Sequence, residues 1–142
     1  MFNAIDVISK ALSATRLRVN TLASNIANAE TTRTDEGGPY KRKDVVQVSR
    51  PEASPFATEM DKASLASPSV LAVVEDQSDP RKVYQPGHPD ADKEGYVAYP
   101  NINVVSTMTD MMSASRLYQA NVTALETARD ISAEALRISQ RS

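Results

Sequence analysis

The sequence contains no cysteine among its 142 residues. The chain therefore forms no disulfide bond, binds no zinc or iron–sulfur cluster through thiolates, and has no catalytic thiol. Its charges almost cancel, with 16 Lys and Arg against 18 Asp and Glu, which excludes the large positive charge of an electrostatic nucleic-acid binder. No apolar run approaches the roughly 18 residues that a membrane helix needs. The first residues lack the basic and apolar regions of a secretory signal, so we expect any export to use another route.

Proline and glycine are confined to the middle of the chain. All eight prolines and all four glycines lie between Gly37 and Pro100. Because proline costs about 3 kcal/mol and glycine about 1 kcal/mol inside a helix, the two ends without either are predicted to be helical. The sequence thus predicts an elongated α+β fold. We expect long paired helices at residues 1–30 and 101–142, and a small, irregular, β-containing middle region at residues 31–100.

Both predicted helices carry the alternating three- and four-residue spacing of a coiled-coil seam. In the first helix, expected at about residues 4–29, the seam positions are Ile5, Ile8, Leu12, Thr15, Val19, Leu22, Ile26 and Ala29. In the second, expected at about residues 104–138 after a start signal at Asn101 or Asn103, they are Val104, Met108, Met111, Ser115, Tyr118, Val122 and Leu125. The stripe then moves around the axis to Ala128, Ile131, Ala135 and Ile138.

The length of the second helix limits how the chain can fold. At 1.5 Å per residue it would be roughly 50 Å long, well beyond the ~30 Å width of a small domain. The shorter first helix can cover only part of it, and two helices alone make a poor core. We therefore expect uncovered apolar stripes that serve as assembly surfaces.

The middle region contains three short β-prone runs, at residues 45–48, 70–74 and 95–99, each bounded by turn residues. These runs predict a small sheet. Residues from Ser49 to Pro68 contain three prolines and no periodic pattern, which predicts a loop.

The residues with the most chemical potential are the single histidine and its neighbours. His88, Asp90 and Asp92 lie within five residues and could in principle hold a divalent metal for hydrolysis. A metal site needs a preformed cage and supporting hydrogen bonds, whereas Pro-Gly-His-Pro-Asp is typical of a rigid surface turn. One histidine also supports no catalytic triad, and the Gly37-Gly38 pair lacks the rest of a phosphate-binding loop. We predict neither an enzyme nor a cofactor.

Several amide side chains lie close to the apolar seams, at Asn20, Asn25, Asn28, Gln119 and Asn121. A buried amide beside a seam costs stability but fixes the register of the paired helices. Alternatively, these amides simply face water. The pattern alone does not decide between the two.

Five segments make the sequence resemble the axial proteins of the bacterial flagellum, and most closely the proximal rod proteins of the FlgC type. LASNIANA at residues 22–29 and SRLYQANV at residues 115–122 are similar to the two terminal motifs of rod and hook proteins. The more specific resemblance comes from YQPGHPDAD at 84–92, EGYV at 94–97 and PNINVV at 100–105. The resemblance covers nearly the whole chain, except that the stretch from Ser49 to Pro68 carries no motif.

The resemblance implies a structural subunit whose terminal helices form the inner wall of a hollow rod and whose middle region packs outward. It implies partners among copies of the chain, other rod proteins, and the export gate and inner-membrane ring. It also implies a place in the basal body on the periplasmic side, reached by flagellum-specific export without a cleaved signal. The alternatives are another rod or hook subunit, or a cytoplasmic helical adaptor.

The residues that we expect to form helix-pair or inter-subunit contacts lie on both helices. They are Ile8, Leu12, Val19, Leu22, Asn25, Ile26 and Asn28 in the first, and Met108, Met111, Arg116, Tyr118, Asn121, Val122 and Leu125 in the second.

Overall fold

The computed structural model describes residues 2–51 and 66–141, which form two long helices and two short antiparallel hairpins. In chain order the elements are α1 (Phe2–Ala27), β1 (Lys43–Pro51), β2 (Ala66–Glu75), β3 (Arg81–Tyr84), β4 (Tyr96–Tyr99) and α2 (Val104–Arg141). The predicted α+β class and both terminal helices are confirmed. At 1.5 Å per residue, the 26 residues of α1 and the 38 of α2 give lengths of roughly 39 and 57 Å.

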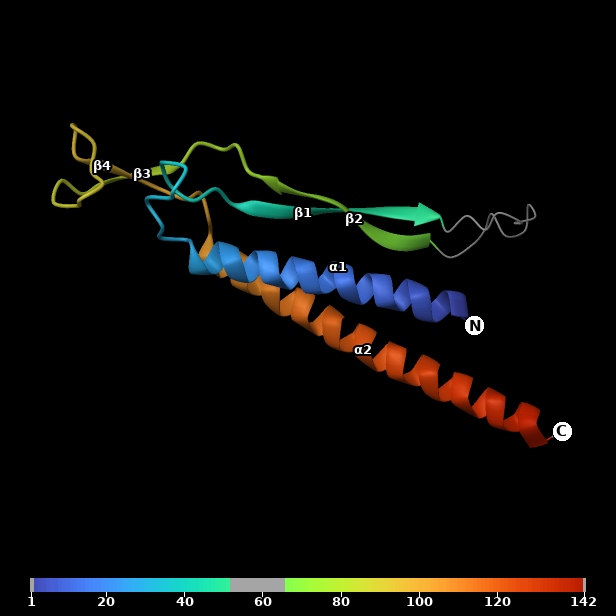
Figure 1. Cartoon of the computed structure of the whole chain (residues 1–142). Helices are drawn as coiled ribbons and strands as arrows, with labels where there is room; N and C mark the ends of the chain where they lie inside the picture. The colour runs from blue at the N-terminus through green and yellow to red at the C-terminus, as the bar shows by residue number, and fades with distance from the viewer. Residues whose placement is uncertain (1, 52–65, 142) are drawn as a thin grey trace.

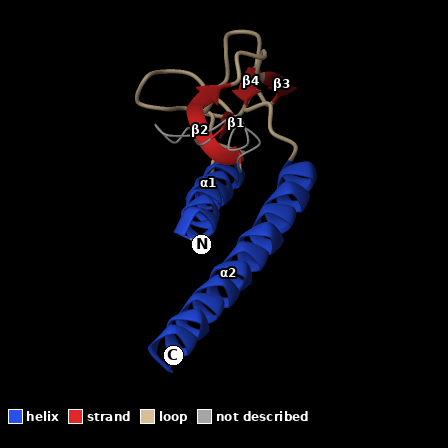
Figure 2. Cartoon of the chain, turned by 90° about the vertical axis from the view of Figure 1, so that its right-hand side faces the viewer, coloured by secondary structure: helices blue, strands red, loops and turns tan. Residues whose placement is uncertain are grey.

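Helix α1 lies between the other two long elements. The ribbon of β1 and β2 runs along one side of α1, and α2 packs on the other side, antiparallel to α1 (Figure 1). The last part of α2 runs past the N-terminus of α1, and Figure 2 shows it extending well beyond the strands as well. The β3–β4 hairpin lies at the opposite end, where α1 ends and α2 begins.

The strands form two separate two-stranded sheets, and the expected small sheet is therefore wrong in this respect. In the ribbon, Lys43 lies opposite Glu75 and Arg50 opposite Ser67, with a register shift after Val46. Strand β3 escaped prediction because Arg-Lys-Val-Tyr is too short and too charged to form an apolar run. Its pairing with β4 holds it in place.

The loop expected from Ser49 to Pro68 is wrong at both of its ends. Residues 49–51 continue β1 and residues 66–68 begin β2, where Ser49 pairs with Pro68. Two of its prolines mislead here: Pro51 is the last residue of β1 and Pro68 the third residue of β2. Both strands of a two-stranded ribbon are edge strands, where a missing backbone donor is tolerated. The rest of that predicted loop, residues 52–65, lies outside the described residues.

The start of α2 follows the sequence signal. The side chain of Asn103 accepts a hydrogen bond from the backbone N–H of Ser106 at 3.1 Å, the arrangement of an N-cap residue that satisfies a free donor of the first turn. Of the two expected start signals, Asn103 is therefore the one that acts.

The chain buries little of itself. It exposes 10408 Å², whereas a compact monomer of 15.4 kDa would expose about 7,200 Å². Among the described residues, the buried apolar side chains are few and mostly small: Ala14, Leu22, Ala29, Val97 and Ala114. The elongated shape thus leaves much of the apolar surface of the helices in solvent.

Candidate assembly interface

The exposed large apolar side chains are concentrated on α2 and on the ribbon. On α2 they are Val105, Met108, Met112, Leu117, Tyr118, Ile131, Leu136 and Ile138, and on the ribbon they are Val46, Leu71, Val73 and Val74. Within the described part of α1 there are none. The uncovered apolar stripe expected from the length of α2 is therefore present. Exposed apolar area of this extent is typical of a protein-binding surface.

The fourteen predicted contact residues fall into three groups. Leu22 and Asn25 are buried. Those that are half-buried are Ile8, Leu12, Val19, Ile26, Asn28, Met111, Asn121, Val122 and Leu125. Met108, Arg116 and Tyr118 are exposed. The first two groups lie mainly along the faces that α1 and α2 turn toward the rest of the chain, and the third is available to a partner.

Asn25 is the most buried amide, with 1% of its surface exposed, and its partner is a strand. Its Nδ2 donates to the carbonyl of Lys43 at 2.8 Å, and its Oδ1 accepts from the N–H of Lys43 at 2.9 Å. The hydroxyl of Tyr40 donates to the same Oδ1 at 3.1 Å. The side chain thus makes the pair of bonds that a neighbouring strand would make, and it fastens α1 to the start of β1.

This geometry corrects the register hypothesis for Asn25, because among the described residues its side chain bonds to Lys43 of β1 and to Tyr40, and not to α2. Asn28 bonds within its own turn, donating to the carbonyl of Ser24 at 2.9 Å. Asn20 and Gln119 are exposed, as the alternative interpretation expected.

Buried threonines are the packing residues that sequence reasoning mostly missed. Thr15, Thr21 and Thr107 are buried, and each hydroxyl donates to the carbonyl four residues earlier, at 2.7, 3.0 and 2.8 Å. This bond satisfies the hydroxyl inside its own helix, so the side chain can be buried without a polar partner elsewhere. Only Thr15 gave a signal, as the one polar residue in the first seam.

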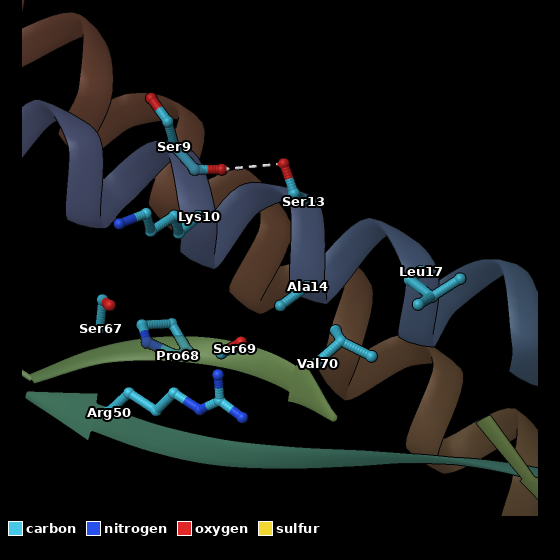
Figure 3. Close-up of a pocket in the computed structure, with 10 residues that line it drawn as sticks. All are labelled: Ser9, Lys10, Ser13, Ala14, Leu17, Arg50, Ser67, Pro68, Ser69 and Val70. Carbon is cyan, nitrogen blue, oxygen red and sulfur yellow. Dashed lines mark hydrogen bonds between the residues drawn. The ribbon is translucent and has the colours of Figure 1, made fainter. Parts of the chain in front are cut away.

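A cleft of about 680 Å³ opens between the N-terminal half of α1 and the ribbon. Figure 3 shows Lys10 and Ala14 of α1 on the side of the helix that faces Pro68, Ser69 and Val70 of β2, whereas Ser9 and Ser13 extend away from the strands. The lining residues are Ser9, Lys10, Ser13, Ala14, Leu17, Arg50, Ser67, Pro68, Ser69 and Val70. The described lining combines four serines and two basic side chains with apolar residues, and it holds no carboxylate or histidine for acid–base chemistry.

The side chains of the histidine turn are occupied by hydrogen bonds. The Nδ1 of His88 accepts from the N–H of Asp90 at 3.1 Å, and Asp90 accepts from Thr32 at 2.8 Å. Asp92 accepts from the N–H of Tyr96 at 2.8 Å. The three groups therefore shape the connection between β3 and β4 and tie it to the segment after α1. Over the described ranges, no group of three or more potential metal ligands is close enough to hold an ion.

Among the described residues, Asp76 is the ionisable group whose pKa clearly departs from its usual value. The hydroxyl of Ser78 and its backbone N–H both donate to Oδ1 of Asp76, and together with the nearby Arg42 guanidinium they hold the pKa of the Asp76 carboxyl below its usual value. These bonds close the turn that follows β2, where the N–H of Asp76 also donates to the carbonyl of Arg42 at 2.7 Å.

Two protein families and several known proteins match this chain. Residues 4–33 match the family described as "Flagella basal body rod protein", and residues 93–138 match "Flagellar basal body rod FlgEFG protein C-terminal". The chain is 39% identical to the flagellar basal-body rod protein FlgC of Borreliella burgdorferi, covering 99% of this chain and 98% of the relative. It is 40% identical to that of Escherichia coli O157:H7, with the same coverage. For Bacillus subtilis the identity is 38%, covering 96% and 97%.

The chain belongs to the FlgC family of flagellar rod proteins. It is a structural subunit of the flagellar rod, and its place is the flagellar basal body. The two family matches fall on the two helices: the first spans most of α1, and the second spans β4 and nearly all of α2. In the described part of this rod protein, no helix is long and apolar enough to cross a membrane.

Proposed function

We propose that the chain assembles into the proximal rod, where its terminal helices pack into the wall of a hollow shaft that transmits torque from the motor to the hook. The observation that carries this proposal is the uncovered apolar surface along α2. Its own chain cannot cover that surface, because α1 is shorter and already packs between α2 and the ribbon. A polymer of such subunits would bury it.

The helices and the middle region would occupy different parts of the rod. Residues 1–30 and 101–142 would form the inner part of the shaft, and residues 31–100 would pack outward. The hydrogen bonds between Asn25 and Lys43 support this arrangement, because they hold the ribbon firmly on α1. A rigid connection is what torque transmission requires between an inner helix and an outer element.

The proposal extends to the assembly partners of the chain, its export route and its lack of catalytic activity. Copies of the chain and other rod proteins would be the lateral partners, and the export gate and the inner-membrane ring would be met during assembly. The rod protein would stand on the periplasmic side, exported by the flagellum-specific route without removal of a leader. It would catalyse no reaction, which agrees with the use of His88, Asp90 and Asp92 as turn-forming groups. A cytoplasmic adaptor is not favoured by the relatives.

Val122→Asp tests the proposed role of the helices. Val122 is half-buried on α2, and Thr123 beside it is exposed. An unpaired carboxylate at a packed seam costs several kcal/mol. We expect the Val122→Asp protein to be exported while rods remain incomplete and cells do not swim, whereas Thr123→Asp cells swim normally. Immunoblots of culture fluid and purified basal bodies would follow both variants. Normal swimming of Val122→Asp cells would refute the seam assignment, and absence of the unaltered chain from basal bodies would refute the function.

A further inference from the structure

Helix α2 carries one uncovered apolar patch near its start. The methionine patch consists of Val105, Met108 and Met112. Their spacing of three and four residues places the three side chains on one side of the helix. Val105 is 75% exposed and Met112 57% exposed. Methionine side chains are flexible and adapt to the shape of a partner, so this patch suits an intermolecular contact.

A second patch lies further along the same helix, with two of its three residues exposed and Ala128 half-buried. The alanine–isoleucine patch consists of Ala124, Ala128 and Ile131, spaced by four and three residues. Ile131 is 57% exposed, and Leu117, seven residues before Ala124, continues the same line with 52% exposed. The two alanines leave a shallow surface between larger side chains, into which a bulky residue of another helix can fit.

The two patches cannot cover each other within one chain. They lie on a single continuous helix, with equivalent positions about 28 Å apart along the axis and a little over a quarter of a turn, about 100°, apart around it. Helix α1 offers no substitute, because none of its described residues is an exposed large apolar one. The complementary surface for each patch is therefore available on another copy of the chain.

We propose that the alanine–isoleucine patch of one copy packs on the methionine patch of the next copy, with the two α2 helices parallel and staggered. Val105 then faces Ala124 and Met112 faces Ile131, an offset of 19 residues in both pairs. Met108 lies beside the gap left by Ala128. This inference rests on the proposed function, to which it adds the partner and the register of one contact.

Charges at the edges of the patches agree with this register. Arg116 follows Met112 by four residues, and Glu134 follows Ile131 by three. A stagger near 19 residues therefore brings Arg116 of one copy to Glu134 of the next. Glu134 also pairs with Arg137 of its own chain at 3.5 Å. Both groups of that pair are largely exposed, so the exchange of partners costs little.

The contact is also directional, as a head-to-tail axial assembly requires. Because the two α2 helices are parallel and staggered, the contact is heterologous, and a two-fold axis cannot relate the two copies. Each added copy leaves one methionine patch and one alanine–isoleucine patch available at opposite ends. The same contact can then repeat.

Cysteine cross-linking in basal bodies tests the register directly, since the chain has no cysteine of its own. Cells would produce the Met112→Cys, Ile131→Cys double variant, and isolated basal bodies would be treated with a short bismaleimide. We expect covalent dimers and higher oligomers of the chain. A link within one chain is excluded because the two positions are about 28 Å apart on one helix. The Met112→Cys, Ala133→Cys variant is the matched control, because Ala133 is exposed on the opposite side of α2 from Ile131; it should remain monomeric.

A second cysteine pair and a charge reversal test the same register independently. If the first pair prevents assembly, the second predicted pair, Val105→Cys with Ala124→Cys, should link in the same way. Arg116→Glu should lower the yield of linked dimer about threefold, and adding Glu134→Arg should restore it.

The outcomes separate this inference from the proposed function. Failure of both cysteine pairs in basal bodies that contain the chain would overturn the inference alone. Linkage of Ile131→Cys to Val73→Cys on the ribbon, in place of the methionine patch, would also overturn it. Absence of the unaltered chain from basal bodies would overturn the function itself.

Discussion

Replacement of Asn25 should damage the fold more than replacement of any other amide on α1. Asn25→Ala removes three hydrogen bonds, at 2.8, 2.9 and 3.1 Å, from a position that is almost fully buried. It also leaves the N–H and carbonyl of Lys43 without their side-chain partner. Each lost bond is worth about 1 kcal/mol, and an unsatisfied buried group costs about 1–3 kcal/mol. We expect a loss of about 2–4 kcal/mol in the free energy of unfolding.

Two measurements on the purified chain check this expectation. Urea unfolding followed by circular dichroism gives the stability difference, and amide hydrogen exchange reports whether the N–H of Lys43 is released. Asn20→Ala is the matched control, because Asn20 is exposed on the same helix and should change stability by less than about 0.5 kcal/mol.

Replacement of Asn25 by aspartate tests the amide donor itself. Asn25→Asp keeps the shape of the side chain but replaces the amide donor to Lys43 with an oxygen. A protonated carboxyl could still donate, so this variant should be more stable at acidic than at neutral pH. If Asn25→Ala and Asn20→Ala prove equally mild, or if Lys43 stays protected in Asn25→Ala, the strand-like role of Asn25 is refuted.

Three other changes have clear expected results in urea unfolding. Gly95→Ala should destabilise the β3–β4 hairpin by about 1–3 kcal/mol, because φ is +85° and a Cβ would lie 2.9 Å from a ring carbon of Tyr84. Leu22→Ala, at a buried helix position, should cost about 2–5 kcal/mol. Lowering the pH should remove the stability contributed by Asp76, because its folded-state pKa is below the usual 3.8: the contribution is complete above 3.8 and is lost as the pH falls through the lower value. Ser78→Ala should weaken this dependence.

The Gly95 and Asp76 predictions each have a control. Gly87→Ala should be nearly neutral, since nothing lies within 4 Å of a Cβ there and its φ is not in the left-handed region. Equal losses for the two glycine variants would show that the contact with Tyr84 does not matter. A Ser78→Ala protein with the acid sensitivity of the unaltered chain would exclude Asp76 as the group concerned.

The helices were predictable because their signals are local. The absence of proline and glycine from both ends and the regular spacing of apolar residues depend on nothing beyond each segment. The cap at Asn103 is of the same kind. Strand β3 was not predictable, because Arg81 and Lys82 give no strand pattern and only the pairing with Tyr99 and Ala98 holds them.

The assembly surface was predictable in extent, whereas the partners of individual residues were not. Helix length and the apolar stripe implied that α2 could not be covered. The position of Asn25 beside a seam implied burial, but its partner Lys43 lies 18 residues further along the chain, beyond any helical periodicity. The same limit explains why the packing of the ribbon on α1 was unexpected.

The contacts inside the chain and the surfaces left outside differ in kind. Inside, α1 packs partly through small buried side chains such as Ala14 and Thr15, and Asn25 bonds it to β1. These contacts bury a modest apolar area. Outside, α2 presents large side chains such as Met112 and Ile131. Since burial of apolar area yields about 25 cal/mol per Å², covering these side chains in contacts between chains would add hydrophobic free energy that one subunit alone does not gain. We therefore expect the full stability of the subunit only in the assembled rod.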